Sequence, residues 1–362
     1  MDKKVGIILI NYKDYATRFL EPCRDSLRRQ NYPQELMPVY IIDNAATPET
    51  DNYLKAGYPE ARILSRSDGN YSAANNLGIK IALQDNCQYV VSVNMDTEME
   101  ADWLKELVLA LDNNPEAGLA QSKVLLYPKN ELDKEKPRVN SSGNLIHFLG
   151  FGFTSGYNQE DNKANDNLYP AIRGYASGCS FIARREALEA INEDGQGFYN
   201  EEYYMYHDDL ELSLKVKLAG YQVILAPRSR IFHKYEFERS ARMIYYMERN
   251  RYLTMLIFYP KLLLALIALP ALVMDIGMIF YSFLGGWIKE EWKIYLYFFK
   301  SETYDKIAQE RARVKKLGRR SFSGLAHDFV GKIEFQEIAN PILSYIVNPL
   351  LNLYWNLVKK II

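Results

Sequence analysis

The chain has 362 residues, of which 48% are hydrophobic and 25% are charged. This composition excludes a disordered or fibrous protein, and the length allows two domains or one large domain with an appendix. The 44 basic and 45 acidic residues leave a formal net charge of -1, so the chain lacks the basic excess by which proteins hold nucleic acid. We therefore expect no nucleic-acid partner.

The cysteines and the N-terminus both favour a cytoplasmic protein. Cys23, Cys87 and Cys179 are far apart and form no C-x-x-C motif, which argues against a disulfide framework or a thiolate zinc site. The first apolar run, at residues 5–10, is too short for a secretory signal. We expect a reducing compartment and an N-terminus that stays in the cytoplasm.

Short apolar runs alternate with amphipathic stretches from residue 5 to about 125. The predicted strands lie at 5–10, 39–42, 62–64, 89–93 and 119–124. The predicted helices lie at 15–30, 49–56, 72–84 and 102–113. Strands joined by helical crossovers form a parallel sheet that binds ligands beyond the carboxyl ends of its strands. Asn11, Asp43 and residues 94–96 lie at such ends.

The next stretch is less regular. Residues 126–170 are polar and glycine-containing, which indicates loops and short strands. A strand is predicted at 180–183 and another at 223–226, followed by His233. Five aromatic residues lie between these strands and would either stack on the rings of a bound acceptor or pack as a core cluster: Phe198, Tyr199, Tyr203, Tyr204 and Tyr206.

Two groups of carboxylates are candidates for chemistry. Asp96 follows a buried strand, where a carboxylate suits a hard divalent cation, although such residues also cap turns. Asp208, Asp209 and Glu211 open a predicted helix, where acids also serve as caps. Their number exceeds what capping requires, and one of them is placed to accept a proton from an acceptor hydroxyl.

His233 follows a strand and a pair of arginines. A lone histidine is usually structural, but Arg228 and Arg230 are cations that would bind phosphate beside it. We therefore keep His233 as a candidate ligand.

The ordered set of motifs resembles the inverting family 2 glycosyltransferases, in particular their rhamnosyltransferase-like members. The resemblance covers about residues 4–260 and rests on Asn11-Tyr12, 26–33, 41–44, 94–96, 174–179, 208–212, 219–221 and His233. It implies the GT-A fold, a Rossmann-like α/β domain with a mostly parallel central sheet. On this basis we predict a nucleotide-sugar-binding half at 1–125, an acceptor-binding and catalytic half at 126–237, and a helical tail at 238–362.

The resemblance also assigns roles. It implies that Asp209 is the catalytic base with Asp208 beside it, and that Asp96 and His233 meet a Mg²⁺ or Mn²⁺ ion. The residues implied to bind the nucleoside diphosphate sugar are Asn11, Asp43, Asn94, and the loop residues Asn70 and Asn75. Asn70 stands where a glycine is usual and Lys215 where an arginine is usual, so the donor stays open.

The implied activity is transfer of a sugar from a nucleoside diphosphate sugar to a hydroxyl of a glycan. The expected acceptor is a lipid-linked glycan in cell-surface polysaccharide assembly. One alternative, a sugar-phosphate nucleotidyltransferase, normally has a glycine-rich basic loop after its first strand, which residues 10–13 lack. The other is a catalytically inactive membrane-bound scaffold of the same fold, against which the retained acids and His233 argue.

The tail has the character of a membrane-associating region. Residues 262–284 are apolar apart from Asp275, Tyr281 and Ser282, and are long enough to cross a bilayer. Residues 306–320 hold seven basic residues and one acid, and 342–362 mix apolar, aromatic and basic residues. We expect this tail to lie in or re-enter the cytoplasmic face of the cell membrane, with a single span as the less favoured possibility. The alternative is a helical core or a dimer interface.

Overall fold

The computed structural model describes residues 3–164, 166–234, 241–334 and 341–362. The strands are β1 (Val5–Asn11), β2 (Val39–Asp43), β3 (Arg62–Ser65), β4 (Tyr89–Val93), β5 (Thr97–Met99), β6 (Ala117–Leu126), β7 (Val139–Ser141), β8 (Asn144–Ile146), β9 (Gly152–Thr154), β10 (Ser180–Arg184) and β11 (Gln222–His233). The helices of the first two thirds are α1 (Tyr15–Arg28), α2 (Pro48–Gly57), α3 (Tyr71–Gln84), α4 (Trp103–Asn113), α5 (Glu131–Glu135), α6 (Arg185–Ala190) and α7 (Asp208–Leu218).

The last third is helical. Its helices are α8 (Ala241–Phe258), α9 (Lys261–Leu284), α10 (Ile288–Phe298), α11 (Ser301–Lys316), α12 (Phe322–Ala326) and α13 (Asn348–Val358). The helix predicted from residue 238 begins, as far as the structure describes it, at Ala241. Residues 238–240 of that prediction lie outside the described residues.

Nine strands of the described chain form one mixed sheet in the order β3-β2-β1-β4-β10-β6-β11-β5, with β7 beside β6. The strands β1, β2, β3 and β4 are parallel, as the alternation of strands and helices predicts. The strand β10 enters antiparallel between β4 and β6. Polar residues that follow β4 therefore lie beside those that precede β10.

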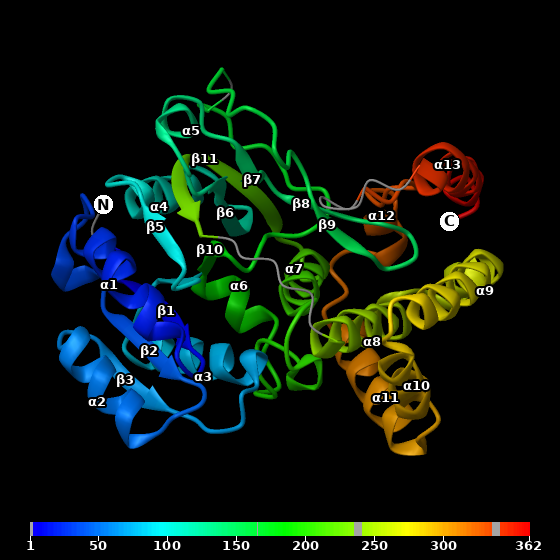
Figure 1. Cartoon of the computed structure of the whole chain (residues 1–362), viewed down its shortest axis with the longest axis horizontal. Helices are drawn as coiled ribbons and strands as arrows, with labels where there is room; N and C mark the ends of the chain where they lie inside the picture. The colour runs from blue at the N-terminus through cyan, green and yellow to red at the C-terminus, as the bar shows by residue number, and fades with distance from the viewer. Residues whose placement is uncertain (1–2, 165, 235–240, 335–340) are drawn as a thin grey trace.

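The two faces of the sheet carry different helices. On β1, Val5, Ile7 and Leu9 pack with residues of α1 and α4, whereas Ile8 and Ile10 pack with residues of α3, α6 and α7. Successive side chains of a strand point to opposite faces, so a strand that is apolar throughout is covered on both. Figure 1 shows these helices around the sheet.

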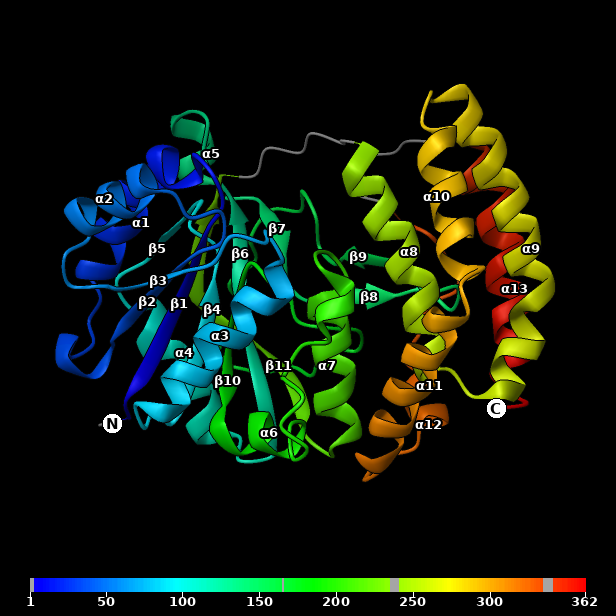
Figure 2. The same ribbon diagram turned by 90° about the horizontal axis from the view of Figure 1, so that it is seen from below.

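Helix α7 joins the sheet to the C-terminal helices. One of its faces, with Leu212 and Val216, packs against the sheet. The opposite face, with Leu210 and Leu214, packs in a separate core with α8, α9, α11 and α13. Figure 2 shows α7 between the sheet and these helices, with α9, α10 and α13 at the end of the molecule remote from β1–β3. A helix buried on both sides gives the acids at its start a fixed position.

Candidate active site

Strand pairing brings Asp96 and His233 together. β5 pairs antiparallel with the end of β11, with Thr97 opposite His233. Asp96 immediately precedes β5, and its Oδ2 lies 3.2 Å from Nε2 of His233. The other ring nitrogen, Nδ1, lies 3.2 Å from Oδ1 of Asn140. Both side chains are buried, and the imidazole of His233 is held between Asp96 and Asn140.

The Asp96 and His233 pair fits a divalent cation. Oδ1 of Asp96 is buried and makes no hydrogen bond to any residue that the structure describes. Within the described residues, no cluster of three or more His, Cys, Asp or Glu side chains could by itself hold a metal ion. A cation here would therefore take one or two protein ligands and complete its shell with phosphate oxygens and water, as Mg²⁺ commonly does.

The environment of His233 differs from the predicted one. Burial acts to lower the pKa of its imidazole, but Cys179 and Asp96 beside it raise that pKa to about 10. The two arginines expected to bind phosphate are engaged elsewhere: Arg228 pairs with Glu106, and Arg230 pairs with Asp161. The prediction of a phosphate-binding arginine pair beside His233 is therefore wrong, because both guanidinium groups neutralise acids of neighbouring elements.

Asp209 is held by backbone donors at the start of α7. Its Oδ2 accepts from the N–H of Gly178 at 2.9 Å, and its Oδ1 accepts from the N–H of Leu210 at 2.8 Å. Burial raises the pKa of the Asp209 carboxyl to about 6, against the opposing effect of these donors. The pKa of the neighbouring Asp208 is raised further, first by burial and then by the charge of Asp209. Asp209 thus ionises before Asp208.

The segment at residues 178–179 links Asp209 to the Asp96 region. The carbonyl of Cys179, the residue after Gly178, accepts from the N–H of Asn94 at 2.9 Å. The side chain of Asn94 accepts in turn from the hydroxyl of Tyr71 at 3.2 Å. Burial raises the pKa of Tyr71, and the charges of Asp208 and Asp209 add to this effect. The two groups of acids therefore border one region, which lies after the end of β4 and before the start of β10.

Asn11 and Asp43 form a second pair on the neighbouring strands. Nδ2 of Asn11 donates to Oδ1 of Asp43 at 2.8 Å, and both residues are fully buried. Oδ1 of Asn11 accepts from the N–H of Ala16 at 2.8 Å, and Thr50 donates to Asp43. The pair lies at the carboxyl ends of β1 and β2, the edge at which open α/β sheets bind their ligands.

The two asparagines of the predicted donor loop have structural contacts. Asn70 caps α3 by accepting from the N–H of Ala73 at 3.1 Å, and donates to the carbonyl of Glu201 at 3.0 Å. Asn75 is fully buried, and its Oδ1 accepts from Ser92 of β4 at 3.0 Å. These contacts join α3 to its neighbours, and the role of both asparagines in donor binding stays a prediction.

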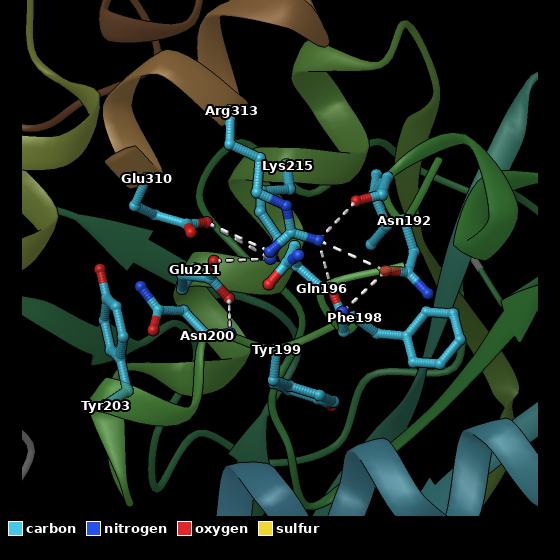
Figure 3. A network of polar contacts seen from close by, with 12 residues as sticks. Asn192, Gln196, Phe198, Tyr199, Asn200, Tyr203, Glu211, Lys215, Glu310 and Arg313 are labelled. Atoms are coloured by element: carbon cyan, nitrogen blue, oxygen red, sulfur yellow. Dashed lines mark hydrogen bonds and ion pairs between the residues drawn. The ribbon is translucent and has the colours of Figure 1, made fainter. Parts of the chain in front are cut away.

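Glu211 and Lys215 form a buried ion pair on the far side of α7. Their charged atoms are 2.8 Å apart and neither side chain is exposed. Glu310 of α11 lies 4.0 Å from the same ammonium group and 3.5 Å from Arg313 (Figure 3). Glu211 is thus explained by packing between α7 and α11, and Lys215, which stands where an arginine is usual, serves this pair.

The aromatic segment before α7 divides into two groups. Phe198, Tyr199 and Tyr203 are buried and belong to the core, so for these three the interpretation as core residues is confirmed. Tyr206 keeps 37% of its surface exposed, and Tyr204 stacks on Tyr246. Stacking on an acceptor stays a prediction for these last two.

Two contributors to the site had no signal in the sequence. Tyr71 begins α3, and nothing in its neighbourhood marks it as a partner of Asn94. Arg242 of α8 donates to the hydroxyl of Tyr204 at 2.8 Å and to that of Tyr12 at 3.5 Å. Arg242 therefore bridges the segment after β1 and the segment before α7, which are separated by almost two hundred residues.

Comparison with protein families gives a match to the model described as "Glycosyl transferase family 2" at residues 6–191. The uncharacterized protein y4gI of Sinorhizobium fredii is 30% identical over 234 residues, which are 62% of this chain and 24% of that protein. The O-antigen biosynthesis protein RfbC of Myxococcus xanthus is 26% identical over 248 residues, which are 67% of this chain and 18% of that protein. The chain spans a quarter or less of these relatives.

The fold also occurs among solved structures. The structure of GalNAc-T7 with UDP, GalNAc and Mn²⁺ aligns with a TM-score of 0.52 and 13% sequence identity, over 72% of this chain and 48% of that one. At this identity the likeness shows the fold alone. Together with the family model it confirms the predicted GT-A fold, an α/β domain followed here by a helical region.

Proposed function

Because this chain belongs to glycosyl transferase family 2, we propose that it transfers a sugar, with inversion, from a nucleoside diphosphate sugar to a hydroxyl of a glycan acceptor. One observation carries the proposal: Gly178 holds the Asp209 carboxylate, and the next residue, Cys179, accepts from Asn94 and lies beside His233, which in turn pairs with Asp96. A proton acceptor and a group suited to a leaving diphosphate thus border the same region. RfbC, a relative named for O-antigen biosynthesis, supports a cell-surface polysaccharide as the product.

The reaction forms one bond and breaks one. The acceptor oxygen attacks the anomeric carbon while the bond from that carbon to the diphosphate oxygen breaks, and the bonding electron pair leaves with the diphosphate. Asp209 takes the proton of the acceptor hydroxyl, for which a pKa of about 6 suits it because the carboxylate is ionised near neutral pH. Attack from the face opposite the leaving group inverts the anomeric carbon.

The leaving diphosphate needs neutralisation. A bound Mg²⁺ or Mn²⁺ would supply a positive charge against its developing negative charge. Asp96 would hold such an ion, and His233, whose pKa is raised to about 10, would have to release its proton to join Asp96 as a ligand. Asn11 and Asp43, at the ends of β1 and β2, would orient the nucleoside. Positioning of this kind supplies much of the acceleration in displacement reactions.

The proposal is tested by incubating the protein with UDP-, dTDP- and GDP-sugars, Mg²⁺ or Mn²⁺, and glycan acceptors. We expect release of a nucleoside diphosphate that depends on the acceptor. Release of pyrophosphate from a sugar phosphate and a nucleoside triphosphate would instead identify a nucleotidyltransferase. Release of neither product would identify a scaffold. UDP-sugars come first in the panel, because the GalNAc-T7 structure contains UDP.

We also propose that the C-terminal helices lie in the membrane interface, where a lipid-linked acceptor is concentrated. Helix α9 is the one described helix that is long and apolar enough to cross a membrane, and 11% of its most apolar window is buried. Its outer face, with those of α10, α13 and their flanks, exposes large apolar side chains: Leu269, Leu272, Val273, Ile276, Phe280, Phe283, Leu284, Trp292, Leu296, Phe299, Tyr345, Ile346, Leu350, Leu353 and Leu357. Such a patch on a folded protein indicates an interaction surface.

The inner face of α9 supports attachment along the interface rather than a span. Asp275, in the middle of the apolar segment, lies 3.3 Å from the buried Arg251 of α8 and accepts from the hydroxyl of Tyr252 at 2.6 Å. Tyr354 of α13 donates to the carbonyl of Leu266. These contacts hold α9 against α8 and α13. If α9 moved away from α8 to cross a membrane, the buried Arg251 would lose its bond to Asp275.

The basic run at residues 306–320 is only partly available to lipid. Arg311 donates to a carbonyl near the end of α8, that of Leu256, and to the carbonyl of Tyr259 just after it, at 2.7 Å each. Lys306 pairs with Glu202 at 2.7 Å, and Arg313 belongs to the network of Glu310. Four further basic residues are exposed at the end of the run: Lys315, Lys316, Arg319 and Arg320. We therefore expect the burial of apolar side chains, rather than attraction between basic residues and lipid, to contribute most to membrane binding.

Replacing Leu272 and Phe280 with glutamate should release the protein from membranes. Each side chain loses apolar contact with lipid and gains a charge, so the bound fraction in sedimentation with anionic vesicles should fall about tenfold or more. The matched control is the pair Leu132→Glu and Leu168→Glu, two leucines that are 63% and 61% exposed outside the tail. Equal binding by both double variants would contradict the proposed membrane surface.

A further inference from the structure

The loop before the acids of α7 has a strained backbone. Tyr204, Tyr206 and His207 have φ angles of 63°, 63° and 60°, in the left-handed region that side chains other than glycine rarely adopt. His207 directly precedes Asp208 and Asp209. Backbone of this kind persists only where the surrounding contacts determine it. Contacts from neighbouring elements must therefore hold the loop.

One fully buried side chain, Asn250 of α8, supplies several of these contacts. Its Nδ2 donates to the carbonyl oxygens of Tyr203, Met205 and Tyr206, each at 2.8 Å. Its Oδ1 accepts from the guanidinium group of the neighbouring Arg249 at 2.8 Å. An amide group is the natural partner for carbonyl oxygens that converge in this way, because it donates without bringing a charge into a buried site.

The loop is also held from the opposite side. The carbonyl of Tyr204 accepts from the N–H groups of Tyr71 and Ser72, the first residues of α3, at 2.8 and 3.2 Å. On the α8 side, Arg249 adds a bond to the carbonyl of Tyr203 at 3.1 Å. The loop therefore lies between α3, which carries the Tyr71 partner of Asn94, and α8. Of these contacts, the side-chain amide of Asn250 can be removed without altering the candidate donor residues.

We propose that Asn250 is a positioning residue for Asp209, which it serves by fixing the strained loop at residues 203–207. The inference rests on the proposed function, since it assumes that Asp209 is the base. Without the amide, the strained residues relax and the start of α7 shifts. A misplacement of about 1 Å between reacting groups can cost about 100-fold in rate. The candidate donor residues Asn11, Asp43, Asn70, Asn75 and Asn94, and the candidate metal ligand Asp96, belong to other elements and are not among the bonding partners of Asn250 described above.

The test is Asn250→Asp, which keeps the size of the side chain but points an acceptor at three carbonyl oxygens. We expect kcat for transfer to fall about 30- to 100-fold while the donor KM stays within about twofold. The ascending limb of the pH profile should also move, because a shifted Asp209 loses its bond from Gly178. Asn250→Gln, which keeps the amide but displaces it by one methylene, should show the same split more weakly and serves if Asn250→Asp fails to fold.

The matched control is Asn348→Asp. Asn348 is also a buried asparagine that clamps backbone, with bonds of 2.8 and 3.0 Å to the N–H and carbonyl of Ile333, but its contacts lie in the C-terminal helices. Its variant should lose a similar amount of thermal stability and keep kcat within about threefold. The inference would be overturned if kcat fell equally in the two variants or stayed unchanged in Asn250→Asp. It would also be overturned if Asn250→Asp changed only the donor KM. A parent protein without transfer would instead refute the proposed function itself.

Discussion

We expect Asp209→Asn to abolish sugar transfer while the donor still binds. The amide has nearly the shape of the carboxylate and can still accept from the N–H of Gly178, but it cannot take a proton from the acceptor. General base catalysis typically contributes about 100- to 10,000-fold, so kcat should fall by that factor. The measurement is acceptor-dependent release of nucleoside diphosphate, with donor affinity measured in parallel by calorimetry. Wild-type turnover by this variant would remove Asp209 from the role of base.

The pH dependence provides a second check on the same residue. The base must be ionised to accept a proton, and the pKa of Asp209 is raised to about 6. The parent rate should therefore decline as pH falls below about 6, roughly tenfold per pH unit. Asp208, Tyr71 and Tyr175 surround this carboxyl and stay protonated over that range, because burial and the charges of the acids raise the pKa of each.

The stability of Asp209→Asn has a predicted sign as well. A carboxyl whose folded pKa is raised favours its protonated form, so the parent loses stability as pH rises from the unfolded value of about 3.9 through the folded value of about 6. The neutral amide avoids this loss. The amide also has only one oxygen for the two N–H groups of Gly178 and Leu210. At pH 7.5 the gain from the neutral side chain offsets the loss of one of these bonds, so the Tm of the variant should stay close to that of the parent, which separates lost catalysis from lost folding. A marked drop in Tm would contradict this account.

Asp96→Ala should lose the part of donor affinity that depends on a divalent cation. Mutating residues that only support a metal ligand commonly costs about 10- to 100-fold, so removing a ligand should cost at least about 100-fold in donor affinity with Mn²⁺ present. With EDTA, the parent and the variant should bind the donor equally weakly. Donor binding by calorimetry, with and without Mn²⁺, measures both quantities.

The control for Asp96→Ala is Asp85→Ala. Asp85 is a carboxylate outside the candidate site, paired with Arg62 at 3.2 Å and bonded to the hydroxyl of Tyr40 at 2.8 Å. Its removal should leave the effect of Mn²⁺ on donor binding intact. If the parent bound donor equally well with and without Mn²⁺, the assignment of a cation to Asp96 and His233 would be refuted.

The parallel half of the sheet could be predicted from the sequence because its signals are local. The runs at 5–10, 39–42 and 89–93 are almost entirely apolar and are followed by polar residues, as expected for strands that are covered on both faces. The strands β5, β7, β8 and β9 have three residues each, too few for any periodicity to appear. Of these, β5 depends on β11, a partner distant in the chain, whereas β8 and β9 pair with each other.

The site shows the same division between local and distant information. The order of motifs pointed to Asp96, Asp209 and His233, but their proximity depends on pairing between β5 and β11 and between β4 and β10. The arginines at 228 and 230 were misassigned because acids far along the chain occupy them. Asn250 had no signal, since an asparagine in a polar helix is ordinary until the carbonyl oxygens around it are seen.

Two adjacent residues of α8 contact different parts of the chain. Asn250 fastens the loop before the acids, and Arg251 next to it meets Asp275 of the apolar helix. Deleting everything after residue 260 would thus expose the buried guanidinium of Arg251 and strip packing from the helix that steadies the loop. A shortened, detergent-free fragment that fails to turn over would say nothing about lipid, so only point changes on the outer face can separate attachment from chemistry.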